Sequence, residues 1–274
     1  MFLKKEYFLL IFIILSLAAF SQNDLPIGKE AFGDGEKLIY TVSYNWGFVW
    51  IDAGEVDFFA KKDSGATYPV WNFISTGSSL KRFDWLYKVR DTFEVRSTTD
   101  VFRPAVFKRN TTEGGHEVYN LYQFDHKLKK GYLFTKETDK GIKYDTIDLK
   151  NNVTDFLTAT YLTRSLQFNG LELNDTLKIP MLIDSKMIAL PIVFQGTEIL
   201  ETHSGVNFHC IKFSALLQKG TMFNAGENIY VWVINDDNKI PVLIEAGIKV
   251  GSIKVHLTSF ENVRHPLTSF IQKE

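Results

Sequence analysis

Residues 38–46 read Leu38-Ile39-Tyr40-Thr41-Val42-Ser43-Tyr44-Asn45-Trp46. Large apolar or aromatic side chains occupy every second position of this stretch, and most of the positions between them are polar. Successive side chains of a β-strand point to opposite faces, so this period of two, carried by β-branched and aromatic residues, predicts a strand with one buried face. Gly47 then ends the pattern.

The same period of two recurs along most of the chain. Turn signals such as Lys62-Asp63-Ser64-Gly65 and Glu113-Gly114-Gly115 separate its copies. We expect further strands over residues 49–60, 68–76, 87–97, 105–110, 117–124, 131–136, 142–149, 176–183, 187–194, 197–202, 206–216, 228–235, 241–245 and 251–260. This spacing of strands and turns is typical of an antiparallel meander.

One helix is predicted near residues 154–168, with Thr154 as its N-cap and Asp155 in the first turn. So many strands around one helix do not fit a small sandwich. The expected fold is therefore all-β: a large antiparallel β-barrel or two curved, packed sheets, lipocalin-like or lipoprotein-carrier-like in architecture. No linker divides the chain, so residues 22–274 are expected to form one β-rich domain, with the helix joining two halves.

Residues 1–21 have the pattern of a secretory signal peptide. Lys4 and Lys5 precede an uncharged apolar run over residues 7–20, and small residues precede Gln22. The run is shorter than the ~20 residues of a transmembrane helix. Since Cys210 is the only cysteine, no lipid can be attached at the cleavage point. We therefore expect a soluble periplasmic protein that is not a lipoprotein and has no stable membrane anchor after cleavage.

The composition argues against several classes of function. The chain has 31 basic and 32 acidic residues, so it lacks the positive excess of a nucleic-acid-binding protein. Its hydrophobic fraction of 45% argues against disorder. We find no metal-ligand motif, no nucleophile elbow around a serine and no phosphate-binding glycine loop. The sequence therefore predicts no catalytic residue, no metal site and no cofactor.

Asp91 is the most informative polar residue. It lies on the apolar side of the strand predicted over residues 87–97. A carboxylate buried there needs a partner, and Arg82 and Arg103 flank the strand. We expect either a structural ion pair or a polar anchor in a ligand cavity. Three tryptophans near strand ends complete the candidate ligand-binding set, either as core residues or as the lip of an apolar cavity: Trp46, Trp50 and Trp85.

Several short motifs in order resemble a known bacterial family. They include Phe32-Gly33-Asp34-Gly35-Glu36, Ala53-Gly54-Glu55, Tyr87-Lys88-Val89-Arg90-Asp91-Thr92-Phe93, Phe102-Arg103-Pro104 and Val231-Trp232-Val233-Ile234-Asn235. Nearly the whole mature chain resembles the family listed as domain of unknown function 3108. The resemblance implies an exported, β-rich envelope protein, and it implies no activity.

The sequence is compatible with three functions. The first is a non-enzymatic periplasmic binding or carrier-like protein for an apolar or amphipathic ligand, such as an envelope lipid. The second is a structural or assembly partner of envelope proteins, acting through an exposed strand edge or an aromatic patch. The third is an unrecognised hydrolase, which we rank last because no catalytic constellation is found.

Overall fold

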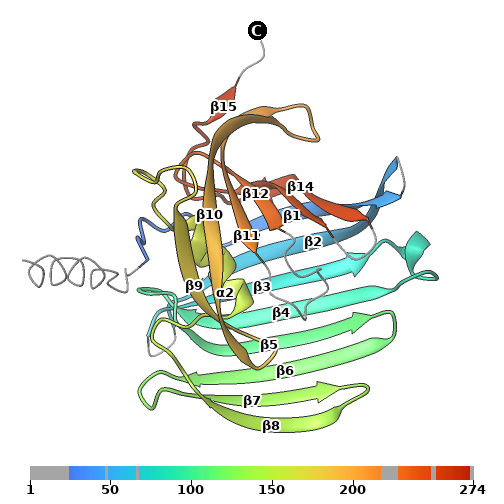
Figure 1. The fold of residues 1–274 in the computed structure, drawn as a ribbon, viewed down its shortest axis with the longest axis vertical. Helices are drawn as coiled ribbons and strands as arrows, with labels where there is room; N and C mark the ends of the chain where they lie inside the picture. The colour runs from blue at the N-terminus through green and yellow to red at the C-terminus, as the bar shows by residue number, and fades with distance from the viewer. Residues whose placement is uncertain (1–24, 47–48, 66–67, 217–227, 248–250, 272–274) are drawn as a thin grey trace, which may run out of the picture.

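The computed structural model describes residues 25–46, 49–65, 68–216, 228–247 and 251–271. The expected signal peptide, residues 1–21, lies outside the described residues. The strands predicted from the period of two are present, several of them longer than expected, and Figure 1 shows them curling around one short helix. No helix in the described part of the chain is long and apolar enough to cross a membrane.

All the named strands belong to one antiparallel sheet. Their bounds are β1 (Glu36–Trp46), β2 (Val49–Asp63), β3 (Val70–Ser79), β4 (Val89–Thr98), β5 (Pro104–Glu113), β6 (His116–Asp125), β7 (Lys130–Glu137), β8 (Gly141–Asp148), β9 (Thr176–Ile183), β10 (Lys186–Glu201), β11 (Asn207–Leu216), β12 (Asn228–Ile234), β13 (Pro241–Gly247), β14 (Ser252–Glu261) and β15 (Phe270–Ile271).

The sheet has 15 strands in the order β8-β7-β6-β5-β4-β3-β2-β1-β14-β13-β12-β11-β10-β9, with β15 paired to β11. The two halves of the chain meet where β1 pairs with β14, with Val42 opposite Val255. β8 and β9 end this path and do not pair with each other. The expected all-β fold is confirmed as a curved, barrel-like sheet that does not close.

One strand, β10, runs from Lys186 to Glu201, where two strands over residues 187–194 and 197–202 were predicted. β10 pairs with β11 from Ile192 to Glu201, and an irregularity in the register falls between Phe194 and Gly196. Gly196 has a φ of 99°, a conformation that glycine adopts without steric cost. The gap between the two predicted strands is therefore a local irregularity within one continuous strand.

The helix α2 (Phe156–Arg164) connects the two halves and lies inside the curve of the sheet. Its N-cap is Asp155, whose carboxylate accepts hydrogen bonds from the amides of Leu157 and Thr158. The prediction of Thr154 as the cap was wrong by one residue. Thr154 instead bonds the edge of β9: its amide donates to the Pro180 carbonyl, and its own carbonyl accepts from the Leu182 amide.

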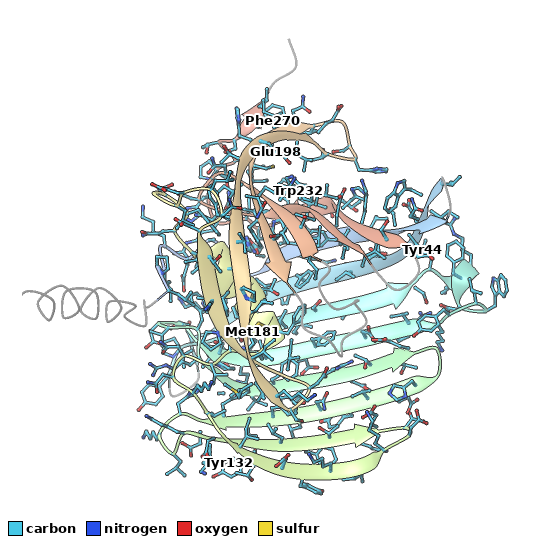
Figure 2. The ribbon with its side chains drawn as sticks, in the orientation of Figure 1. Tyr44, Tyr132, Met181, Glu198, Trp232 and Phe270 are labelled. Carbon is cyan, nitrogen blue, oxygen red and sulfur yellow. The ribbon has the colours of Figure 1, made fainter. Side chains whose placement is uncertain are left out.

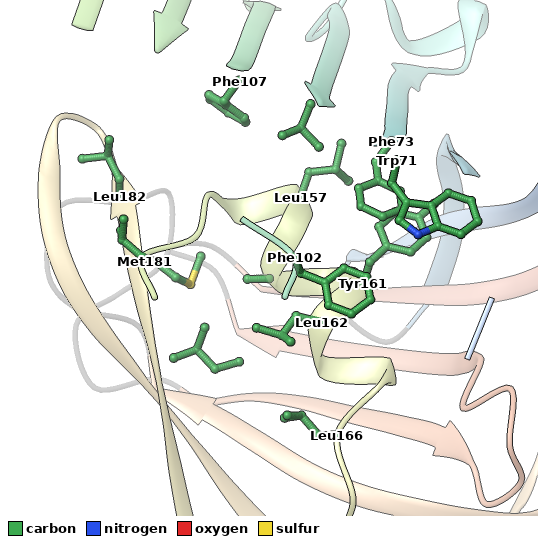
Figure 3. Packing of buried hydrophobic residues seen from close by; sticks show 14 of the residues in the cluster. Trp71, Phe73, Phe102, Phe107, Leu157, Tyr161, Leu162, Leu166, Met181 and Leu182 are labelled. Atoms are coloured by element: carbon green, nitrogen blue, oxygen red, sulfur yellow. The ribbon is translucent and has the colours of Figure 1, made fainter. Parts of the chain in front are cut away.

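The larger core lies between α2 and the inner face of the sheet (Figure 3). Tyr161 of α2 stacks on Phe73 of β3 with ring centroids 3.9 Å apart, and Phe32 packs edge-on against Tyr161 at 4.9 Å. From the other half, Met181 and Leu182 of β9 approach the same helix. The helix therefore fills the space between the two halves with apolar side chains.

Candidate functional site

The side chains of β6 and β7 alternate between the core and the outer face. On β6, Asn120, Tyr122 and Phe124 are buried, whereas the residues between them are half-buried or exposed. On β7, Gly131 and Leu133 are buried and Tyr132 is exposed. In the middle of the two strands, Tyr119, Leu121, Tyr132 and Phe134 face away from the core, where this pattern ordinarily places polar residues.

The register of three strands brings these outward side chains together. Leu121 lies opposite Phe134, and Phe134 lies opposite Tyr144 of β8. The Phe134 ring is 5.9 Å from the Tyr119 ring and 5.1 Å from the Tyr144 ring, centroid to centroid. Figure 2 shows Tyr132 on the outer strands of this half of the sheet.

A groove of about 720 Å³ follows this outer face, and we call it the aromatic groove. Its lining residues are Tyr119, Leu121, Gln123, Tyr132, Leu133, Phe134, Tyr144, Asp145 and Thr146. Tyr132 is 42% exposed and Tyr144 is 76% exposed, so the rings are open to a ligand. Gln123 and Thr146 add polar groups to an aromatic wall, which is the usual composition of a binding site for an organic ligand.

Sequence reasoning did not identify the aromatic groove. The usable signal was the tyrosine at each of three outward positions on consecutive strands: Tyr119, Tyr132 and Tyr144. Tyrosine favours strands in general, so each one alone looked like ordinary strand composition. Only the register of the three strands shows that their rings form one surface.

Asp91 lies on β4 with its side chain on the inner face of the sheet, opposite Thr111 of β5. Its Oδ1 atom is buried, and no hydrogen-bond partner for it lies among the described residues. Burial, and then the nearby charge of Glu113, raises the pKa of Asp91 to about 6, while Arg109 acts in the opposite direction. Asp91 therefore sits between an acid and a base on a largely apolar face.

The two arginines proposed as partners of Asp91 do not pair with it. Arg82 donates from Nη2 to the Asp52 carbonyl at 2.9 Å and lies over the Phe83 ring. Arg103 follows the β4–β5 turn, which is the opposite end of β4 from Asp91. The expected pairing was wrong because Arg109, two residues along β5 from Thr111, is the base that the sheet register brings near.

Arg103 instead lines a second cavity of about 300 Å³ at the end of the sheet where β4 meets β5. The other lining residues are His126, Lys129, Leu149, Lys150, Asn151 and Asn152. The structure thus separates Arg103 from Asp91 and from Arg82. The three polar residues of the predicted site do not form one site.

Two of the predicted tryptophans, Trp50 and Trp85, lie apart from the core. Trp85 is 82% exposed and Trp50 is 41% exposed, and Lys254 places its Nζ 4.9 Å from the centre of the Trp50 ring. Trp46 ends β1, and its side chain lies outside the described residues. Trp50 follows the β1–β2 connection and Trp85 lies within the β3–β4 connection, so both stand at the same end of the sheet.

Neither a metal group nor a reactive thiol was found in the described segments. They contain no group of three or more histidine, cysteine, aspartate or glutamate residues that could hold a metal ion. Cys210 is a free, buried thiol, and burial raises its pKa to about 12. A thiol that stays protonated at neutral pH is a poor nucleophile.

One solved structure has a similar fold over most of the chain. The chain is similar to the crystal structure of a beta-barrel-like protein of domain of unknown function DUF1849 from Brucella abortus, with 11% identity and a TM-score of 0.52 over 85% of this chain and 98% of that one. A hypothetical protein from Chlamydia trachomatis shares 7% identity at a TM-score of 0.36, over 88% of this chain and 94% of that one. No curated protein matches the sequence.

Residues 39–258 match the family described as protein of unknown function DUF3108. The matched range starts within β1 and ends within β14, so it includes α2, the aromatic groove and Asp91. The resemblance seen in the short motifs therefore extends over most of the fold, and the chain belongs to the DUF3108 family.

Proposed function

We propose that this protein is a non-enzymatic binding protein that holds an amphipathic ligand in the aromatic groove. One observation carries the proposal: four aromatic rings of three adjacent strands line a single open groove of about 720 Å³, a volume typical of sites for small organic molecules. Tyr132 and Tyr144 would be the main contacts, since both rings are exposed. A ligand that covers them removes apolar ring surface from water.

The groove favours a ligand with one apolar face and one polar face. Phe134 and Leu121 lie opposite each other in it, and Gln123 and Thr146 supply amide and hydroxyl groups for hydrogen bonds. We further propose that the protein meets this ligand in the bacterial periplasm after export, on the basis of the leader pattern in residues 1–21. A lipid of the cell envelope has this amphipathic chemistry.

An uncharged fluorescent probe tests the groove directly. N-phenyl-1-naphthylamine should brighten on binding to the mature protein, and octyl glucoside below its micelle concentration should displace it. Replacing Tyr132 and Tyr144 by alanine together should weaken probe binding at least about tenfold, because two ring contacts are lost. Tyr68→Ala is the matched control, since Tyr68 is 76% exposed, as is Tyr144, and does not line the groove. Equal binding by wild type and the double variant would exclude the groove.

A second candidate function is assembly of two copies through β8. β8 and β9 end the sheet, and Thr154 bonds to the edge of β9. No described residue bonds in this way to the free edge of β8, which exposes Ile142 and Tyr144. An unpaired strand edge can form hydrogen bonds with a strand of another molecule. The simplest closed assembly of this kind is a symmetric dimer in which the two β8 strands pair antiparallel.

The charges on β8 select one register for such a pair. With Tyr144 opposite Tyr144 of the second copy, Lys143 of each copy lies opposite Asp145 of the other. Shifting the register by two residues places either two lysines or two aspartates face to face. Light scattering should therefore find a dimer that Asp145→Lys weakens and that the exchange of Lys143→Asp with Asp145→Lys restores. A monomer at every concentration would exclude this assembly.

A further inference from the structure

The connection between β3 and β4 exposes three consecutive large apolar side chains. Trp85 is 82% exposed, Leu86 is 56% exposed and Tyr87 is 52% exposed. The segment Lys81–Lys88, which we call the β3–β4 tip, contains them together with the short 3-10 helix η1 (Lys81–Phe83). A contiguous exposed apolar patch of this kind ordinarily marks a contact surface.

The β3–β4 tip is held in shape by its own hydrogen bonds. The amides of Leu86 and Tyr87 both donate to the Phe83 carbonyl, at 2.9 and 3.0 Å. Asp84 accepts from Arg90 at 2.6 Å and from the Ser79 hydroxyl at 2.6 Å, and these two bonds hold the pKa of Asp84 below its usual range. The backbone that carries the exposed side chains is therefore ordered before binding, so binding a partner costs little conformational entropy.

The charged groups of the β3–β4 tip are mainly basic. Lys81, Arg82 and Lys88 are exposed. The one acid of the segment, Asp84, is paired with Arg90. The tip therefore presents three cations around a tryptophan, a leucine and a tyrosine.

The neighbouring β1–β2 end extends the same surface. Val49 is 60% exposed and Trp50 is 41% exposed. The bond from Arg82 Nη2 to the Asp52 carbonyl, at 2.9 Å, joins this end to the β3–β4 tip. Lys254 lies over the Trp50 ring and adds a further positive charge. Apolar and basic side chains thus alternate across the ends of two hairpins.

We propose that the β3–β4 tip and the β1–β2 end dock the protein on an anionic lipid surface. Tryptophan and tyrosine favour the boundary between water and hydrocarbon, because each has an apolar body and a polar group. Lysine and arginine attract anionic headgroups, and their stems lie along apolar surface. A protein partner would explain the aromatic side chains, but three exposed cations without an unpaired acid in the segment favour anionic lipid headgroups. This docking does not depend on the aromatic groove.

Vesicle sedimentation tests the docking with the mature protein. We expect binding to vesicles of phosphatidylcholine mixed with phosphatidylglycerol, and much weaker binding to pure phosphatidylcholine. Trp85→Ala combined with Leu86→Ala should weaken binding about tenfold or more, because two apolar side chains that insert into the lipid surface are removed. Lys81→Gln combined with Lys88→Gln should weaken binding to the anionic vesicles by a similar factor and leave the weak binding to phosphatidylcholine unchanged.

Two controls separate docking from general adhesion. Tyr68→Ala removes an equally exposed ring elsewhere, and Lys127→Gln removes an exposed cation at the other end of the sheet, so both should bind vesicles as wild type does. The Tyr132→Ala and Tyr144→Ala double variant should also bind normally, which distinguishes this proposal from the groove. Wild-type binding by the Trp85→Ala and Leu86→Ala variant, or equal loss in the controls, would overturn the proposal.

Discussion

Arg164 of α2 and Glu36 of β1 form a fully buried ion pair with two parallel contacts, Nη1 to Oε1 at 2.5 Å and Nη2 to Oε2 at 2.9 Å. Arg164 also donates to the backbone carbonyls of Ala31 and Asn238. One guanidinium thus joins the helix to the start of the first strand and to the β12–β13 turn. This one side chain therefore bonds to both halves of the sheet.

Removing one member of this pair should leave the other charge buried without compensation. Glu36→Gln and Arg164→Met should each lower the free energy of unfolding by about 3–5 kcal/mol, as measured by urea denaturation. The pair Glu30–Arg264 is a suitable comparison, because Arg264 is 42% exposed and its loss should cost less than about 1 kcal/mol. If Arg164→Met and Arg264→Met lower the free energy of unfolding by similar amounts, burial does not account for the cost of breaking the Glu36–Arg164 pair.

Asp91 should make the stability depend on pH. Its pKa of about 6 in the folded protein lies above the ordinary value of 3.8, so the folded state binds this proton more tightly than the unfolded state. The stability gained from protonated Asp91 is therefore full below pH 4 and is lost as the pH rises through 6. Asp91→Asn removes this dependence.

Thermal melts from pH 4 to 8 check the effect of Asp91. Asp91→Asn should melt at a higher temperature than wild type above pH 6, and the two curves should converge near pH 4. Glu55→Gln, on an exposed position of β2, should give no such difference. A constant gap between wild type and Asp91→Asn at every pH would contradict the predicted titration.

The alternation in residues 38–46 predicted the strand and its buried face because that signal is local: each side chain takes its face from its own position. The turn after β12 is also local: the Asp236 carboxylate accepts from the amides of Asn238 and Lys239, two and three residues along the chain. The partner of Asp91 and the aromatic groove could not be predicted in the same way. Both depend on which residues of separate strands lie opposite one another.

Asp155 should matter to the helix more than Thr154, which the sequence had suggested as the cap. The Asp155 carboxylate accepts from two backbone amides and from the Thr158 hydroxyl, all buried. Asp155→Ala should lower the free energy of unfolding by about 2 kcal/mol or more, because the cap is lost and buried amides stay unpaired. Asp155→Asn keeps an acceptor oxygen and should cost less than about 1 kcal/mol. Equal losses from the two variants in urea titrations would show that the charge, rather than the acceptor, stabilises the helix.

Replacement by phenylalanine should have opposite effects on stability at two buried tyrosines, Tyr40 and Tyr161. The Tyr40 hydroxyl donates to the Pro241 carbonyl at 3.1 Å, whereas the Tyr161 hydroxyl is buried with no hydrogen-bond partner among the described residues. Tyr40→Phe leaves the Pro241 carbonyl unpaired and should cost about 1 kcal/mol of unfolding free energy. Tyr161→Phe removes an unpaired polar group, keeps the stacking on Phe73, and should leave the stability unchanged or raise it by about 1 kcal/mol. Urea titrations of both variants at one pH give the comparison directly, and a larger loss for Tyr161→Phe than for Tyr40→Phe would mean that the Tyr161 hydroxyl is stabilising.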